Sequence, residues 1–291
     1  MVRGHVQGAV LCAVLAGCGT SPRAADEEQQ AIIGGSADAD DPAVFLLKAQ
    51  PKQGPGWLCS STLVAPDVVL TAAHCVNAVG TYRVFTGSDL SQVTAADVRS
   101  VREVHAHPKY DDAHIENGYD VGVALLSDAV TSIAPLAMNR TAMTSALIGS
   151  DVRLVGFGVS DAKTGSGVGL RRDVMVKLDA FTAMVLAVGD RTHGTCSGDS
   201  GGPALMTIDG QEVIVGVTSF GNEACDSDSF EDRVDALVSF VDGYVDGDAG
   251  TAQSVPAPAD SSGCTIAHGG SSRLGPLLLV LVLRLRRRST R

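Results

Sequence analysis

The main part of this chain is short of positive charge. Residues 32–246 hold 14 Lys and Arg against 28 Asp and Glu, a formal balance of −14. The whole chain carries −11, because most of the remaining basic residues gather near its C-terminus. A body this acidic repels phosphate backbones, so the sequence argues against a nucleic-acid partner.

Metal-ligand spacings and long apolar runs are also missing. The sequence has no CxxC pair and no suitably spaced His and Cys ligands, so we expect no zinc or other metal site. The apolar run of residues 274–285 has about a dozen residues, against the ~20 that a membrane-spanning helix needs. A permanent transmembrane anchor is therefore not expected.

Composition divides the chain into five segments. Hydrophobic residues make up 45% of the chain, enough to bury a core, which argues against global disorder. We predict a leader (1–18), a polar and acidic connector (19–31), a folded body (32–245), a linker rich in Pro, Ala, Ser and Gly (246–262) and a tail (263–291).

The leader resembles a bacterial export signal. Arg3 precedes an apolar stretch, residues 8–17, and the string Leu15-Ala16-Gly17-Cys18 resembles the lipobox of bacterial lipoproteins. On this interpretation Cys18 is lipidated and becomes the new N-terminus. The alternative is an ordinary secretory signal in which Cys18 is incidental.

The tail combines Cys264, the short apolar run and a cluster of arginines. It resembles the C-terminal sorting tails of myxobacterial-type surface proteins, and the alternative is a short membrane helix held by basic anchors. We therefore expect an exported protein of the bacterial cell envelope or surface, or one released to the medium. Membrane contact is expected through the termini only.

Short Val-rich runs alternate with Gly, Asp and Ser along the body, a pattern typical of an all-β barrel or sandwich. The clearest runs are residues 68–70, 121–126, 152–155 and 213–217. Asp232–Val245 differs, because Val234, Leu237, Val238 and Val241 recur at helical spacing. This segment predicts a helix that packs on the body.

The string Gly198-Asp199-Ser200-Gly201-Gly202-Pro203 carries the strongest chemical signal. Hydrolysis of an amide needs a nucleophile, a base, a group that orients the base, and donors for the oxyanion. Glycines on both sides of Ser200 permit a tight turn, and the N–H groups of Gly198 and Ser200 could form an oxyanion hole. The string resembles the nucleophile loop of the trypsin/chymotrypsin-like serine proteases.

Two further motifs extend this resemblance. The string Leu70-Thr71-Ala72-Ala73-His74-Cys75 is similar to the histidine motif of the family. Asp120 opens an apolar run, as the family's aspartate does, although Gly122 departs from the commonest pattern. Asp128 is a weaker candidate because it opens no such run. The order His74, Asp120, Ser200 is that of chymotrypsin, unlike the order in subtilisins or α/β-hydrolases.

The resemblance implies the fold, the partners and the cysteine pairing. It implies an all-β protein with two six-stranded antiparallel β-barrels of the chymotrypsin type and a C-terminal helix. It also implies a monomer that acts on polypeptides without a cofactor. Four of the seven cysteines lie in the body, and an even number in an exported protein predicts two disulfides. The family's pattern joins Cys59 to Cys75 and Cys196 to Cys225.

The string Ile32-Ile33-Gly34-Gly35 resembles the mature N-terminus of the family. Cleavage before Ile32 by an activating protease would free an α-ammonium. In the family this group pairs with the acid beside the nucleophile, here Asp199, and such a buried pair acts as a switch. Ala31 precedes the cut, so an activator that cleaves after Arg or Lys is not implied. The alternative is a plain β-strand start.

The primary specificity pocket also follows from the resemblance. Gly194 falls at its floor, where trypsins carry Asp, and Ser219 and Gly221 fall on the strand that lines it. Thr195 and Ser229 are the other expected pocket residues. Because Gly194 supplies no carboxylate, we expect uncharged side chains before the scissile bond.

Three alternatives remain open at this stage. Asp226 and Asp228 reach the pocket from its other wall, or they belong to a solvated acidic loop. A catalytically inactive binding protein is allowed on the same fold, although it typically lacks a triad residue and none is missing here. An esterase with the same triad is allowed too, although Ile32 favours a peptidase.

Overall fold

The computed structural model describes Met1 and residues 32–245. The predictions for the leader, the connector, the linker and the tail fall on residues 2–31 and 246–291 and lie outside the described residues. In the described part, no helix combines the length and the apolar character needed to cross a membrane.

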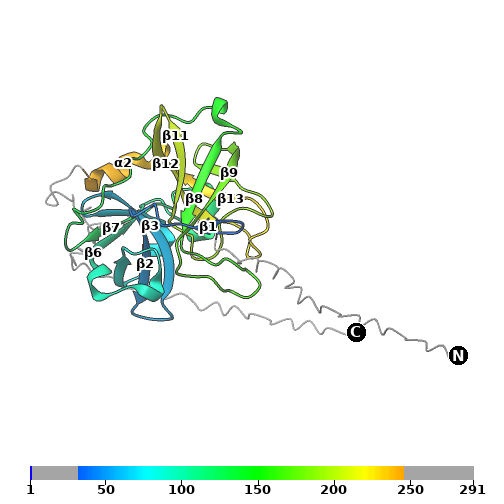
Figure 1. Cartoon of the computed structure of the whole chain (residues 1–291). Coiled ribbons are helices and arrows are strands. Elements are labelled where there is room, and N and C mark those ends of the chain that lie inside the picture. The colour runs from blue at the N-terminus through cyan, green and yellow to red at the C-terminus, as the bar shows by residue number, and fades with distance from the viewer. Residues whose placement is uncertain (2–31, 246–291) are drawn as a thin grey trace, which may run out of the picture. The chain divides into compact units, whose positions relative to one another are not determined.

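The first half of the body forms a closed antiparallel barrel in the order β2-β3-β4-β7-β6-β5 (Figure 1). Its strands are β2 (Val44–Pro51), β3 (Trp57–Ala65), β4 (Val68–Thr71), β5 (Gly80–Phe85), β6 (Val98–Ala106) and β7 (Gly122–Leu126). β4 and β7 pair with each other and are buried along their whole length, as expected for uninterrupted apolar runs at a core.

The second half forms the other barrel, from six strands, with β1 (Ser36–Ala37) added beside β9. The six are β8 (Asp151–Gly156), β9 (Arg172–Phe181), β10 (Val185–Val188), β11 (Pro203–Ile208), β12 (Gln211–Phe220) and β13 (Ser229–Arg233). β8 pairs with both β9 and β11, which closes the sheet. Along β9, Val174, Val176 and Leu178 are buried and the residues between them are exposed, the period of a strand with one face on a core.

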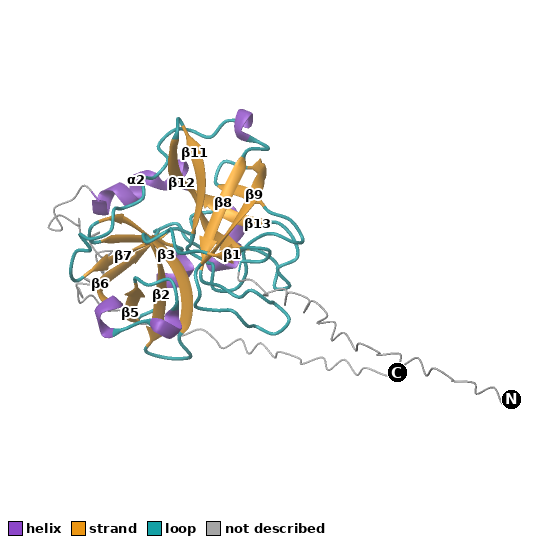
Figure 2. Cartoon of the chain, viewed as in Figure 1, coloured by secondary structure: helices purple, strands orange, loops and turns teal. Residues whose placement is uncertain are grey.

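The helices are short (Figure 2). α1 (Ala73–Val76) follows β4, and α2 (Val234–Val245) follows β13 and packs against β12, β4 and β7, which come from both barrels. The other helical turns between residues 32 and 245 are the 3-10 segments η1 (Leu90–Gln92), η2 (Ala95–Asp97), η3 (Asp112–Asn117) and η4 (Ser145–Leu147).

The predicted fold is confirmed, with one change at the C-terminal helix. Val234, Leu237 and Val241 are its buried face, as their spacing predicts. Asp232, however, lies on β13 and not in the helix, because it and Arg233 continue the pairing with β12. The prediction began the helix two residues early, and the difference concerns a residue that contacts the candidate site.

Candidate active site

His74 lies on α1 and is held against Asp120, which lies two residues before β7 begins at Gly122. The Nδ1 atom of His74 lies 2.7 Å from Oδ2 of Asp120, and the backbone N–H of His74 donates to Oδ1 at 2.8 Å. The Asp120 side chain is fully buried, whereas the His74 side chain is 28% exposed. A buried acceptor therefore fixes one side of a ring whose other side can reach solvent or substrate.

Ser219 and Asp232 also hold Asp120 in place, and the sequence did not predict either contact. The hydroxyl of Ser219 donates to Oδ2 of Asp120 at 2.6 Å. The backbone N–H of Asp120 donates to the carboxyl of Asp232 on β13. Burial and, to a smaller extent, the nearby charge of Asp120 together raise the pKa of Asp232 to about 7. Asp120 is thus fixed by contacts from both barrels.

Ser200 follows Gly198 on a loop that is tied to the first barrel through Ser60. Gly198 has φ of 98°, and a Cβ at this position would lie 3.0 Å from the Cα of Gly158, so glycine is required there. The hydroxyl of the buried Ser60 donates to the carbonyl of Gly198 at 3.0 Å, and its N–H donates to the carbonyl of Ser200 at 2.8 Å. Sequence reasoning missed Ser60, since a serine within a strand gives no signal of its own.

The same loop leaves two N–H groups available. Within the described residues, the N–H groups of Asp199, Gly201 and Gly202 donate to backbone carbonyls, whereas those of Gly198 and Ser200 have no protein acceptor. These are the two groups that the sequence suggested for an oxyanion hole. An unpaired N–H pair at a turn is suited to bind a developing negative charge.

Both predicted disulfides are confirmed. Cys59 is bonded to Cys75, and Cys196 to Cys225. The first joins β3 to α1 and lies beside the nucleophile loop, because the carbonyl oxygen of Ser200 lies 3.7 Å from the sulfur of Cys75, the neighbour of His74. Cys59, His74 and Cys75 also group closely enough to resemble a metal site, but the disulfide consumes both thiols and leaves no thiolate ligand.

Asp199 is completely buried and accepts two backbone hydrogen bonds. The N–H of Gly158 donates to Oδ1 at 2.7 Å, and that of Cys196 donates to Oδ2 at 2.9 Å. Burial raises the pKa of Asp199 to about 7, although these hydrogen bonds and the charge of Arg172 act in the opposite direction. A nearby cation would stabilise the ionised carboxylate.

Ile32 lies inside the second barrel rather than on its surface. Its side chain is completely buried within that core. Its φ is 49°, a left-handed conformation that is strained for a β-branched residue. The next residue, Ile33, accepts a hydrogen bond from the N–H of Gly194 at 3.2 Å. The start of the body is therefore docked beside the predicted pocket.

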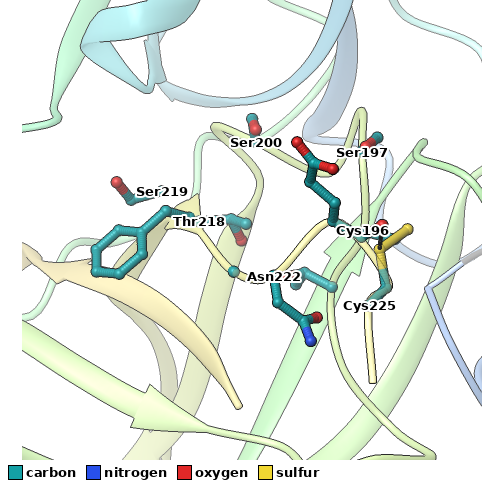
Figure 3. Close-up of a pocket in the computed structure, with 11 residues that line it drawn as sticks. Cys196, Ser197, Ser200, Thr218, Ser219, Asn222 and Cys225 are labelled. Carbon is teal, nitrogen blue, oxygen red and sulfur yellow. Dashed lines mark hydrogen bonds between the residues drawn. A yellow bond between two sulfur atoms is a disulfide. The ribbon is translucent and has the colours of Figure 1, made fainter. Parts of the chain in front are cut away.

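A pocket of about 190 Å³ opens next to Ser200. Figure 3 shows the Cys196–Cys225 disulfide on one side of it and Thr218 and Ser219 on the other. The predicted residues Thr195, Ser219 and Gly221 line it, together with Glu223.

The remaining predicted pocket residues lie elsewhere. Gly194 and Ser229 stand behind the lining, where the Ser229 hydroxyl accepts a hydrogen bond from the N–H of Thr195 at 2.8 Å. Asp226 and Asp228 are exposed and do not line the pocket, and the Asp226 carboxylate instead accepts a hydrogen bond from Asn222 at 2.6 Å. The alternative that these aspartates reach the pocket receives no support from this geometry.

Three buried acids should make the uncut protein less stable as the pH rises. Burial raises the pKa of Asp199 and Asp232 to about 7 and that of Glu231 to about 8. The folded chain therefore keeps protons that the unfolded chain releases near pH 4. The free energy of unfolding should fall between about pH 5 and pH 8, at roughly 1.4 kcal/mol for each unit of pKa difference.

Urea denaturation of the Ser200→Ala chain across this range measures the effect. Glu231→Gln removes one of the three protons and should give a shallower decline. If the free energy of unfolding fell equally with pH in the Glu231→Gln variant and in its parent, ionisation of Glu231 would not destabilise the fold.

Comparison with known proteins places this geometry in a family. The trypsin family profile matches residues 32–241. A chymotrypsin-like elastase family member 1 of Felis catus is 28% identical over 250 residues, which cover 78% of this chain and 94% of that protein. The Bos taurus protein of the same name is 27% identical over 75% of this chain and 91% of its own length. A brachyurin of Leptuca pugilator is 30% identical over 64% of this chain and 85% of its own length.

The profile match extends from the buried Ile32 to within α2, so it covers both barrels and the site between them. The chain belongs to the trypsin family, and it is a trypsin/chymotrypsin-like serine endopeptidase.

Proposed function

We propose that the chain hydrolyses peptide bonds through Ser200, His74 and Asp120, and that it is made as a precursor activated by cleavage before Ile32. The contact between Asp120 and His74 is the main support for this reading. Both oxygens of a fully buried carboxylate accept hydrogen bonds from His74, which fixes the ring and its tautomer.

In the proposed mechanism the hydroxyl of Ser200 attacks the scissile carbonyl while Nε2 of His74 takes its proton. His74 then gives this proton to the leaving amine, and water repeats the sequence to release the acid. Asp120 keeps the Nδ1–H tautomer and stabilises the imidazolium. The free N–H groups of Gly198 and Ser200 would bind the oxyanion.

Activation is proposed from the surroundings of Asp199 and Ile32. A buried carboxylate beside the nucleophile has a raised pKa, and the Ile32 side chain is already inside the same barrel. A cut before Ile32 removes the φ constraint on this residue and creates an α-ammonium that can pair with Asp199. This pairing would stabilise the loop that carries Gly198.

We expect the uncut precursor to be about 10²- to 10³-fold less active than the cut form, the effect of losing one oxyanion donor. The test uses a chain in which the residues before Ile32 form a site for a protease that leaves Ile32 as the new N-terminus. Peptidase activity is measured before and after cleavage.

Asp199→Asn should remove the gain on cleavage, because an amide offers the ammonium no charge. Acetylation of the new amine removes its positive charge. Reductive methylation keeps that charge and therefore serves as the matched control. Full activity in the uncut chain would contradict the proposal.

One comparison separates this function from its two rivals. The cut protein is assayed with casein and with a fluorophosphonate that labels an activated serine. Proteolysis with labelling of Ser200 is expected. Labelling without proteolysis would favour an esterase. The absence of both labelling and proteolysis would favour an inactive binding protein.

We also propose export and attachment through the ends of the chain, from the sequence alone. The lipobox-like string at Cys18 and the sorting-type tail beginning near Cys264 support an envelope or surface location. A cut before Ile32 would separate the body from a lipid on Cys18. The partners are then a polypeptide substrate and an activating protease, and the enzyme acts as a monomer.

A further inference from the structure

Glu231 is a buried acid that the proposed mechanism does not use. It lies in the middle of β13 with a fully buried side chain. Among the described residues neither carboxylate oxygen has a partner at hydrogen-bond geometry, although the Thr218 hydroxyl is close enough to lower the pKa of Glu231. An unpartnered buried carboxyl is costly, so proteins rarely keep one without a use.

The register of the sheet places Glu231 behind the pocket. It pairs directly with Thr218 on β12, and residues that pair directly project from the same face of a sheet. Thr218 lines the pocket (Figure 3). Ser229, two residues earlier and therefore on the same face of β13, contacts the N–H of Thr195, another lining residue. Glu231 thus lies behind residues that line the pocket, without belonging to that lining itself.

In the uncut chain, the charges of the described residues that act on Glu231 are negative. Asp199, from the nucleophile loop, and Asp232, the next residue on β13, both raise the pKa of Glu231 through their charge. The paired strand β10 (Val185–Val188) carries no titratable residue, and β12 contributes the uncharged Thr218 opposite Glu231. Among the described residues that line the pocket, Glu223 is the one that carries a charge.

We propose that Glu231 makes the primary pocket selective for a cationic side chain, lysine or arginine, before the scissile bond. The proposal rests on the proposed peptidase function and replaces the uncharged preference expected from Gly194. A cation in the pocket would supply the partner that Glu231 lacks, in a site screened from water. The carboxyl loses its proton to solvent as the cation enters.

This arrangement predicts that the selectivity depends on pH. Burial raises the pKa of Glu231 to about 8, and the Thr218 hydroxyl opposes that shift. Below this pH an empty pocket holds a neutral acid and favours uncharged side chains. Above it the pocket holds a carboxylate. Cation preference should therefore rise about 10-fold per pH unit up to about pH 8 and then level off.

The first test compares two peptides that differ only in lysine or norleucine before the scissile bond. The ratio of their kcat/KM values between pH 6 and 9 cancels the titration of His74, which both share. The ratio should rise with pH in the wild type and stay low and flat in Glu231→Gln. Glu223→Gln, the matched change at the other pocket acid, should keep the rise. A ratio that is flat in the wild type, or that rises equally in Glu231→Gln, would overturn the proposal.

The second test needs no catalysis, so it separates this proposal from the peptidase function. Benzamidine, a cation, and benzamide, its neutral counterpart, are titrated calorimetrically into the cut Ser200→Ala chain at pH 7. Titration in two buffers of different ionisation enthalpy gives the protons released. Benzamidine should bind tighter and release close to one proton, and Glu231→Gln should release none. Equal binding of the two probes, or no proton release by the wild type, would refute the role of Glu231 even if peptides are cleaved.

Discussion

Ser200→Ala should lower kcat about 10⁶-fold while leaving the fold and peptide binding intact. Alanine removes only the hydroxyl, and the backbone contacts of Ser200 with Ser60 and the first barrel do not use it. The residual rate should come from the oxyanion donors and from binding alone. Kinetics with a chromogenic peptide, after cleavage before Ile32, measure the loss.

His74→Ala should cost about as much, and the double variant Ser200→Ala/His74→Ala should be no worse than either single one. Nucleophile and base act as one unit, so their effects do not add. Additive losses in the double variant would show that the two residues act independently. A Ser200→Ala enzyme with more than a few per cent of normal activity would exclude Ser200 as the nucleophile.

The candidate site residues were predicted from the sequence where a few consecutive residues carry the chemical signal. The loop around Ser200, the turn that carries His74 and the strand that begins after Asp120 each combine a reactive side chain with small neighbours over a few residues. Local strings of this kind can be recognised without any knowledge of how the chain packs. The two disulfides followed from the same resemblance, and the structure joins the same cysteines.

The supporting residues could not be found in this way, because their partners are distant in the chain. The hydroxyl of Ser60 reaches a carbonyl 138 residues away, and Asp232 reaches Asp120 across 112 residues. The periodic pattern even assigned Asp232 to a helix. A strand and a helix can meet without a break in hydrophobicity, and only the pairing with β12 shows where one ends.

The pocket is the clearest example of this limit. Alignment by motif drew attention to Gly194 and to the aspartates after Cys225, whereas the buried acid near the pocket is Glu231. Successive residues of β13 face opposite sides of the sheet, so Asp232 faces Asp120, whereas Glu231 shares a face with Thr218, which lines the pocket. One strand thereby contacts the residue that orients the candidate base on one face and carries the proposed specificity residue on the other.

Asp120→Asn should lower kcat about 10⁴-fold through the tautomer of His74. The backbone N–H of His74 can only donate, so the one oxygen of the introduced amide must stay opposite it, in place of Oδ1. The NH₂ group of that amide then faces Nδ1, and Ser219 can rotate its hydroxyl to accept from it. His74 is left with Nδ1 as an acceptor and a proton on Nε2, where it cannot receive one from Ser200. Activity should recover at high pH, where other bases replace His74.

Asp128→Asn, a matched change at an exposed carboxylate, should have little effect. If Asp128→Asn caused the loss and Asp120→Asn did not, Asp120 would not be the residue that orients His74.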